Sequence, residues 1–284
     1  MGTLVACSDG SPSSSVTPEN MSNAVVVDEA QPEAPVVSQI VALTSLTADI
    51  IETLDSEKLV GISGSRILSQ DERFAGLETV SEGRTEPDLE KIIALEPDLV
   101  IGAKGFHDRT LASLHDLEIE TLAVDVKGWG SLRELTQQLA QKIGADPAPL
   151  MERYDACLAK TPDSGPTALV LVSRQPLLSP NKQSWAGDFL AKFQLENLTA
   201  QMQGESPFEG YITLSEEKVL TSNPDILLVV ETGDNLLAQL QQDPFWGQLK
   251  ATQEGQVYTV DYFGLVNPGN IASIEAVCDK LSTL

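Results

Sequence analysis

The sequence predicts an α/β fold of two lobes, each built around a central parallel-rich sheet. From Gln39 onward, short β-branched and aliphatic runs alternate with amphipathic segments, which is typical of strands and helices in βα units. This alternation occurs in two groups along the 284 residues, a length that allows each lobe its own hydrophobic core. A helical bridge separates the two groups. Ligands of such lobes bind outside the carboxyl ends of the strands, so we expect a cleft between the lobes.

The first 37 residues are expected to form a disordered acidic tether. They are rich in Ser, Pro, Asn and Glu and contain no Lys or Arg. Near their start, residues 4–8 (LVACS) resemble the bacterial lipobox, in which the cysteine, here Cys7, is lipidated. The basic and long apolar segments of a full leader are missing. Cys7 is therefore either the anchor of a trimmed lipoprotein, which the tether behind it favours, or an incidental thiol.

The strands are predicted from short apolar runs, and helices such as 46–54 and 111–117 fill the intervals. The N-terminal lobe is expected to cover residues 38–146 and the C-terminal lobe residues 162–284. The expected strands are 40–43, 59–62, 99–101 and 121–124 in the first lobe, and 168–172, 226–230 and 257–260 in the second.

Two helices are predicted in the bridge between the lobes. Ser131 and Glu134 form a capping box that opens the first helix, and Gly144 ends it. Asp146 caps the second, which has a proline at its first position and runs over 147–160. Such a helix is about 21 Å long. We therefore expect residues 147–161 to join the lobes as a single rigid helix.

The two lobes also share a sequence pattern. Residues 88–101 (DLEKIIALEPDLVI) and 215–228 (SEEKVLTSNPDILL) both contain Glu-Lys, a short apolar helix, Pro-Asp and a buried strand in the same order. Proline ends the helix and aspartate begins the turn into the strand. The pattern places Glu90 and Glu217 at equivalent positions in related lobes.

The composition disfavours several function classes. Eighteen Lys and Arg against 42 Asp and Glu give a formal net charge of −24, which repels nucleic acid. The two histidines, His107 and His115, lie in no hydrolase or metalloprotease motif, and no dinucleotide or phosphate loop is present. The sequence therefore predicts neither an enzyme nor a resident metal or cofactor. Cys157 and Cys278 are expected on helices, either as buried free thiols or as a disulfide.

The motifs resemble those of a known family. The strings 83–92 (GRTEPDLEKI) and 97–101 (PDLVI), with the two lobes and the bridge, resemble the class III substrate-binding proteins of bacterial ABC importers, which serve ferric siderophores, haem and cobalamin. Residues 83–90, 243–249 and 255–258 are similar to the ferric-hydroxamate binder of that family. The resemblance implies a monomeric receptor of the periplasm or cell envelope, lipid-anchored, that delivers a ferric siderophore to a dimeric permease. Iron would enter only as part of this ligand.

The ligand-binding residues are expected at the cleft. Arg84 is the leading candidate, because the family places its ligand-binding arginine in this motif and a guanidinium can donate two bonds to chelating oxygens. The alternative for Arg84 is a surface arginine beside the Glu86 turn. Other cations and aromatic residues expected near the carboxyl ends of strands or in cleft loops are Arg66, Phe106, Trp129, Arg174, Trp185, Phe208, Tyr211 and Tyr262.

Glu90 and Glu217 are expected to dock the receptor onto the permease. The resemblance implies one glutamate per lobe, each meeting an arginine pocket on one of two identical permease subunits. Both are otherwise ordinary glutamates near helix N-termini, where the helix dipole favours a negative charge. Three alternatives stay open for the whole chain: a cobalamin or haem receptor of the same family, an enzyme on a chelatase-like two-lobed scaffold, and an interaction lipoprotein without transport.

Overall fold

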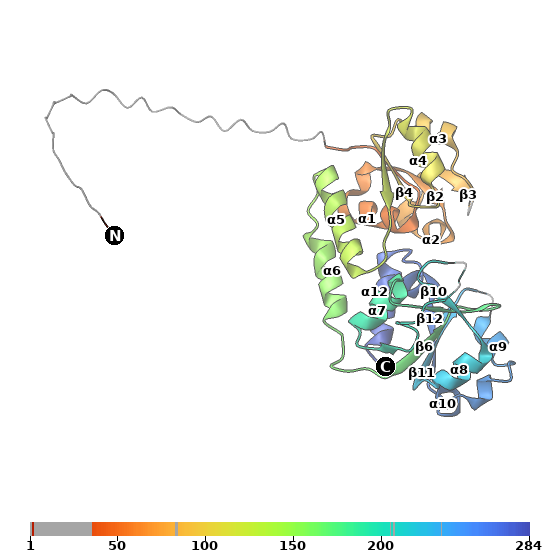
Figure 1. The fold of residues 1–284 in the computed structure, drawn as a ribbon. Helices are drawn as coiled ribbons and strands as arrows, with labels where there is room; N and C mark the ends of the chain where they lie inside the picture. Colours follow the sequence, from red (N-terminus) through yellow and green to blue (C-terminus); the bar gives the residue numbers. More distant parts are fainter. Residues whose placement is uncertain (1, 3–35, 83–84, 205, 207, 234) are drawn as a thin grey trace, which may run out of the picture. The chain divides into compact units, whose positions relative to one another are not determined.

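The computed structural model describes Gly2 and residues 36–82, 85–204, 206, 208–233 and 235–284. Cys7 and Arg84 lie outside these residues. Residues 36–284 form one compact unit, within which two groups of strands and helices make two lobes (Figure 1). The α/β class and the parallel-rich sheets predicted from the sequence are confirmed.

The N-terminal lobe contains one five-stranded sheet in which every pairing is parallel, in the order β3-β2-β1-β4-β5. Its strands are β1 (Ile40–Ala42), β2 (Leu59–Gly64), β3 (Glu78–Glu82), β4 (Leu99–Ala103) and β5 (Glu120–Val124). The sequence analysis missed β3, an edge strand in which only Val80 and Ser81 are buried. An edge strand with mostly polar residues lacks the apolar run by which the others are recognised.

Helices and two short 3₁₀ segments connect the strands of this sheet. Thr44 opens the first helix by accepting the Thr47 N–H, and the buried face that follows includes Leu46, Ile50 and Ile51. The helical segments are α1 (Ser45–Asp55), η1 (Ser56–Lys58), α2 (Arg66–Ser69), η2 (Glu72–Phe74), α3 (Leu89–Ala94) and α4 (Asp108–His115).

The C-terminal lobe contains a parallel sheet of order β12-β11-β6-β9 and a smaller antiparallel sheet of order β10-β8-β7. The strands are β6 (Thr167–Leu171), β7 (Ser173–Arg174), β8 (Leu177–Pro180), β9 (Glu196–Asn197), β10 (Tyr211–Leu214), β11 (Ile226–Glu231) and β12 (Val257–Asp261). The helical segments are α7 (Trp185–Lys192), α8 (Glu216–Ser222), α9 (Leu236–Leu240), η3 (Trp246–Gln248), α10 (Lys250–Gln253), α11 (Tyr262–Leu265) and α12 (Ile271–Leu281). The sequence analysis did not predict β7 to β10.

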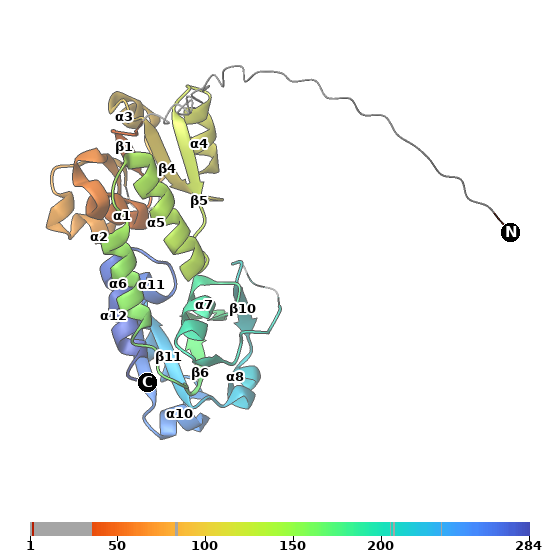
Figure 2. The ribbon, with the colours of Figure 1, turned by 90° about the vertical axis from the view of Figure 1, so that its left-hand side faces the viewer.

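The bridge consists of two antiparallel helices, α5 (Trp129–Ile143) and α6 (Ala148–Leu158), seen side by side in Figure 2. An Arg133–Asp155 ion pair of 2.6 Å joins them. The first helix begins two residues before Ser131, whose hydroxyl instead accepts the backbone N–H of Gly128. The second helix is shorter than predicted, about 16 Å by its 11 residues.

A disulfide between Cys157 and Cys278 joins the end of the bridge to α12, with Cα atoms 5.6 Å apart. The sequence had left this pairing open. Among the helices that the structure describes, none is long and apolar enough to cross a bilayer.

Candidate ligand-binding site

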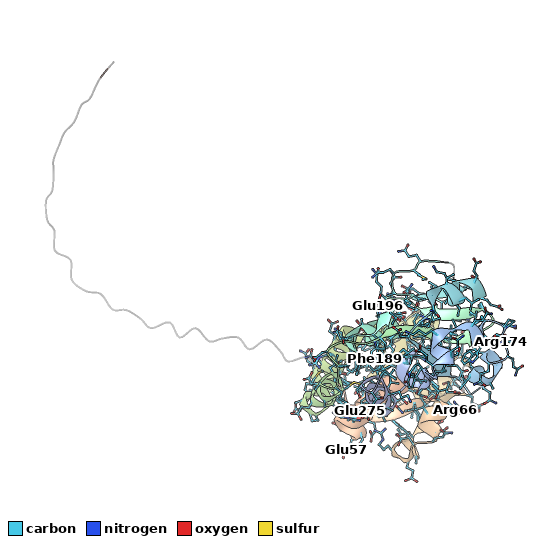
Figure 3. All side chains as sticks on the ribbon, turned by 90° about the horizontal axis from the view of Figure 1, so that it is seen from below. Glu57, Arg66, Arg174, Phe189, Glu196 and Glu275 are labelled. Carbon is cyan, nitrogen blue, oxygen red and sulfur yellow. A yellow bond between two sulfur atoms is a disulfide. The ribbon has the colours of Figure 1, made fainter. Side chains whose placement is uncertain are left out.

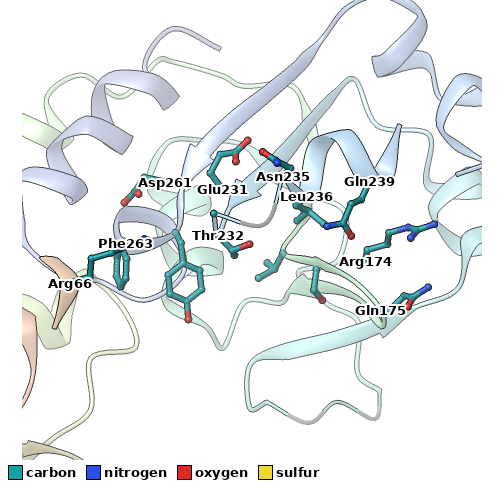
Figure 4. Close-up of a pocket in the computed structure, with 14 residues that line it drawn as sticks. Arg66, Arg174, Gln175, Glu231, Thr232, Asn235, Leu236, Gln239, Asp261 and Phe263 are labelled. Carbon is teal, nitrogen blue, oxygen red and sulfur yellow. The ribbon is translucent and has the colours of Figure 1, made fainter. Parts of the chain in front are cut away.

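A cavity of about 970 Å³ opens where strands of the C-terminal lobe end (Figure 4). The strands concerned are β6, β11 and β12, whose parallel arrangement brings their carboxyl ends to one edge of the sheet. One residue from the other lobe, Arg66, completes the wall. The lining residues are Arg66, Val172, Ser173, Arg174, Gln175, Glu231, Thr232, Gly233, Asn235, Leu236, Gln239, Asp261, Tyr262 and Phe263.

Glu231 and Asp261 end adjacent strands in register with each other. In-register residues of neighbouring parallel strands lie about 4.8 Å apart and point to the same face. After Glu231, the chain turns through Gly233 at a positive φ of 92°, a conformation in which glycine carries no steric penalty. The strand register therefore places Glu231 and Asp261 side by side at the ends of β11 and β12, and both line the cavity.

Arg174 lines the cavity from the β7–β8 hairpin, but its charge is already paired. The Arg174 Nε lies 2.9 Å from Oδ2 of Asp243, and its Nη2 lies 2.5 Å from Oδ1. The two residues therefore form a bidentate ion pair. The hydrogen bond to Asp243 raises the pKa of Arg174. Arg174 thus presents the cavity with a guanidinium whose charge is largely neutralised.

Arg66 stands at the first position of α2, behind the Ser65 cap. It is exposed, and its guanidinium has no ion-pair partner among the residues that the structure describes. Tyr262 and Phe263 lie nearby at the start of α11, with ring centroids 5.2 Å apart in an edge-to-face arrangement. One end of the cavity therefore combines an unpaired cation with an aromatic wall.

Trp129 and Trp185 do not line the cavity, contrary to expectation. They are only 2% and 3% exposed and pack together with Phe189, which Figure 3 shows within the packed interior. Trp129 lacked a helical period in the sequence only because α5 was predicted to begin at Ser131. Since the helix begins at Trp129, this indole lies on the same face as the buried Leu132.

Three other expected aromatic residues also lie outside the cavity wall. Phe106 and Phe208 are 63% and 60% exposed, and neither is among the lining residues. Tyr211 is half-buried, with its hydroxyl 3.4 Å from the Val266 carbonyl oxygen, and burial raises its pKa. Of the residues predicted from sequence and described by the structure, the cavity brings together Arg66, Arg174 and Tyr262. Their contact with a ligand stays a prediction.

The sequence analysis missed most of the polar lining, above all Glu231 and Asp261. A signal was present, because each residue directly follows an apolar run that was correctly predicted as a strand. The residues expected at the cleft were cations and aromatic residues, and the carboxylates at the same strand ends were not among them. Gln175 could not be found in this way, since its hairpin was not predicted.

Polar contacts also join one lobe to the other. Asp49 of α1 is 2% exposed; its Oδ2 accepts the N–H of Ile271 at 2.7 Å, at the start of α12, and its Oδ1 accepts Arg73 at 2.7 Å. On the β5–α5 loop, the Lys127 ammonium lies 3.0 Å from Glu209 of the other lobe, and this bond raises the lysine's pKa.

Glu90 and Glu217 are both exposed and both occupy the second position of a short helix, α3 and α8. The structure therefore places them equivalently in the two lobes, as their sequence pattern suggests. Their role in docking is untested by this geometry.

No group of three or more His, Cys, Asp or Glu side chains among the described residues is arranged to hold a metal ion. His107 is buried, its Nδ1 accepts the Ala103 N–H at 2.9 Å, and burial lowers its pKa. The His107 side chain therefore stabilises the turn after β4.

The lobes, the bridge and the cavity at the strand ends define a substrate-binding protein of two lobes. Residues 40–262 match the periplasmic binding protein family, and the chain belongs to this family. The membership confirms the resemblance seen in the sequence and agrees with the expectation of a binding protein, not an enzyme.

Among curated relatives, the Fe(3+) dicitrate-binding periplasmic protein FecB of Escherichia coli (strain K12) is 27% identical over 194 residues, covering 63% of this chain and 60% of that protein. The vitamin B12-binding protein of Salmonella typhi is 25% identical over 209 residues, covering 69% and 73%. Among solved structures, an ABC transporter substrate-binding protein from Listeria monocytogenes EGD-e superposes with a TM-score of 0.72 at 21% identity, covering 87% of this chain and 97% of that one. This last likeness supports the fold.

Proposed function

We propose that this protein is an extracytoplasmic receptor that captures a ferric siderophore and delivers it to a dimeric ABC permease for iron uptake. The observation that carries the proposal is the cavity at the ends of β6, β11 and β12, whose wall is mostly hydrogen-bonding side chains. Its volume of about 970 Å³ is at the upper end of the usual range for small-molecule sites.

The chemistry of the lining suits an oxygen-rich chelate. A siderophore supplies all the ligands of its iron, so the receptor needs donors for the chelate oxygens and an apolar surface for its body. Arg66 and Gln175 offer donors, and Tyr262 and Phe263 offer the surface. The name of the Escherichia coli relative, an Fe(3+) dicitrate-binding protein, adds support for ferric cargo.

We include Arg84 in the proposed binding set because it lies in the motif of residues 83–90, where the family has its ligand-binding arginine. The proposal also assigns Phe106 and Phe208 to the cleft rim, because both are exposed aromatic residues in loops. Trp129 and Trp185 leave the binding set and become part of its support, since the Trp185 Nε1 donates to the Gly264 carbonyl oxygen at 2.8 Å, beneath α11.

The decisive experiment is retention of a chromophore. Purified protein is mixed separately with a ferric trihydroxamate, haemin or cobalamin, desalted, and examined by absorbance and calorimetry. We expect only the ferric chelate to be retained with 1:1 stoichiometry, and Arg84→Ala or Arg66→Ala to weaken it by about 1.5 to 3 kcal/mol. Retention of haemin or cobalamin with loss of the ferric chelate would overturn the siderophore assignment.

Docking onto the permease is assigned to Glu90 and Glu217. The double variant Glu90→Lys/Glu217→Lys should bind cargo normally and fail to support uptake in cells, because rim charges set orientation and association rate. The matched control is Glu57→Lys/Glu254→Lys, which makes the same charge change at two exposed glutamates, one in each lobe. Uptake that survives the first pair, or fails equally with the control, would contradict the docking role.

Lipid anchoring through Cys7 completes the proposal, with the receptor acting as a monomer on a tether. Cys7→Ser should release the protein from the membrane fraction of cells without changing its affinity for cargo. Membrane association that persists in this variant would count against the anchor. Sedimentation velocity at increasing concentration tests the monomer.

A further inference from the structure

His107 closes the turn between β4 and α4 through two reciprocal hydrogen bonds with Ala103. The His107 N–H donates to the Ala103 carbonyl oxygen at 2.8 Å, and the Ala103 N–H donates to Nδ1 of the His107 ring at 2.9 Å. His107 is only 6% exposed, and it packs over Gly102, where a Cβ atom would lie 2.8 Å from that of His107. The closed turn therefore depends on the state of one buried imidazole.

That state is the neutral imidazole with its hydrogen on Nε2. Because Nδ1 accepts a hydrogen bond, it carries no hydrogen of its own. Protonation would place a second N–H group against the Ala103 N–H and replace the bond with repulsion. His107 is also the cap residue of α4, and a positive charge at a helix N-terminus is disfavoured by the helix dipole. The protonated ring is therefore incompatible with the closed turn.

The charges around the ring do not reverse this preference. Burial lowers the pKa of His107, and the neighbouring Asp108 carboxylate, which accepts the Gly105 N–H at 2.8 Å, offsets only part of that effect. The other charged side chains on the turn and on the elements around it are all exposed, where water screens them: Lys104, Arg109, His115, Glu86, Glu90, Lys91, Asp125 and Lys127.

The turn lies at the edge of the N-terminal sheet that faces the other lobe. The sheet is parallel, and β4 lies between β2 and β5 in its order, so their carboxyl ends share one edge. Arg66, which follows β2, lines the cavity, and Lys127, which follows β5, pairs with Glu209 of the second lobe. The turn between them carries Phe106, which is 63% exposed and meets the His107 ring edge-to-face with 4.8 Å between centroids.

We propose that His107 is a pH-dependent positioning residue, which in its neutral form holds Phe106 in place for the cargo and on protonation opens the turn. The role of Phe106 rests on the proposed function, whereas the opening of the turn does not. A histidine with a lowered pKa in the closed turn stabilises that turn fully above its ordinary pKa of 6.5, and this contribution is lost as the pH falls toward the lowered value. We therefore expect acid to weaken cargo binding.

NMR and hydrogen exchange test the opening of the turn without any cargo. The chain has two histidines, and the exposed His115 at the other end of α4 provides the second signal. We expect Nδ1 of His107 to carry no hydrogen at pH 7.5. Exchange of the Ala103 amide, corrected for its intrinsic pH dependence, should accelerate as His107 becomes protonated. Protection of this amide that persists after His107 is protonated would overturn the inference.

Calorimetry with ferric desferrioxamine B, a trihydroxamate, tests the consequence for cargo. The wild type should bind it about three- to tenfold more weakly at pH 5 than at pH 7.5, because only molecules with a closed turn are competent. His107→Asn, whose amide oxygen accepts a hydrogen bond but does not titrate, should lose most of this ratio. His115→Asn is the matched control and should keep it.

Phe106→Ala shows whether His107 acts through the aromatic ring. This variant should bind the ferric chelate more weakly at pH 7.5 and should also lose the pH ratio, although its His107 still titrates. Because Phe106 is exposed, its removal should leave the fold intact, which circular dichroism verifies. A pH ratio that is unchanged in His107→Asn or in Phe106→Ala overturns the positioning role.

The outcomes separate this inference from the proposed function. Equal affinity of the wild type for the ferric chelate at both pH values overturns the role of His107 in binding while the proposed function stands. Retention of haemin or cobalamin with no ferric chelate bound overturns the proposed function. The exchange rate of the Ala103 amide still decides whether protonation opens the turn.

Discussion

The two lobes share a strand order, but only one of them builds most of the cavity. The order β2-β1-β4-β5 in the first lobe corresponds to β9-β6-β11-β12 in the second. In the first lobe, β3 extends the parallel sheet; in the second, β10 pairs instead with β8 in a separate antiparallel sheet. That sheet places Arg174 on the cavity wall, so a local change in strand pairing accompanies the cavity in the second lobe.

The shared sequence pattern has the same structural role in both lobes. Glu96 and Asn223 both adopt left-handed φ values, of 46° and 39°, and each precedes Pro-Asp. Asp98 then accepts the N–H groups of Ser38 and Gln39, at the start of β1. In the second lobe, Asp225 accepts the N–H of Thr167, the first residue of β6. In both lobes this aspartate holds the first strand of the lobe, β1 or β6, beside the strand that follows Pro-Asp, β4 or β11.

The largest expected difference between the lobes concerns the disulfide, which ties α6 only to the second lobe. Cys157→Ala/Cys278→Ala should reduce the free energy of unfolding by about 3 to 5 kcal/mol, because the bond closes a loop of 121 residues. Hydrogen exchange should accelerate most in α12. An equal acceleration in the N-terminal sheet would show that the lobes unfold as one unit. The disulfide would then not stabilise the second lobe more than the first.

The next effect tests how the lobes are held together. Asp49→Ala should cost about 3 kcal/mol of unfolding free energy, since it leaves the α12 N-terminus and Arg73 without a buried acceptor. The control is Glu52→Ala, which removes another Arg73 partner but no contact with α12, and should cost less than about 1 kcal/mol. Equal losses in the two variants would contradict a joining role for Asp49.

The two buried tryptophans should respond unequally to replacement by phenylalanine, which removes the indole N–H and causes a similar loss of ring volume at both positions. The Trp185 Nε1 donates to the Gly264 carbonyl oxygen, whereas the Trp129 Nε1 has no partner among the described residues. Trp185→Phe should therefore cost about 1 kcal/mol more than Trp129→Phe in chemical unfolding. An equal or greater cost for Trp129→Phe would contradict this prediction.

The smallest expected effect is a difference in acid sensitivity between the two equivalent aspartates. Hydrogen bonds from Lys250 and Thr167 lower the pKa of Asp225 to about 2, and hydrogen bonds from Ser38 lower that of Asp98. A lowered native pKa stabilises the fold fully above the unfolded value of about 4, and this contribution is lost as the pH falls to about 2.

In the wild type, the free energy of unfolding should fall as the pH falls from 4 to 2. Asp225→Asn should reduce this fall more than Asp98→Asn does. The reason is the additional Asp225–Lys250 ion pair of 2.6 Å. Carboxyl NMR titration gives the two values directly. A carboxyl of Asp225 that titrates at an ordinary value would refute the prediction.

The sequence by itself determined the α/β class, the central strands and the relation between the lobes. These features depend on local patterns: apolar runs for β1, β4, β6 and β11, and the repeated Pro-Asp strings that end at residues 98 and 225. Such patterns are readable because a buried strand needs consecutive apolar residues whatever the remainder of the chain does.

Only the tertiary structure decided which residues meet at the cavity. The two extra residues at the start of α5 move Trp129 from an expected cleft position into the core, and the strand register places Glu231 beside Asp261 although 30 positions separate them in sequence. Asp49 reaches Ile271 across 222 positions. Contacts of this kind arise from packing and register between distant elements, and local periodicity carries no information about them.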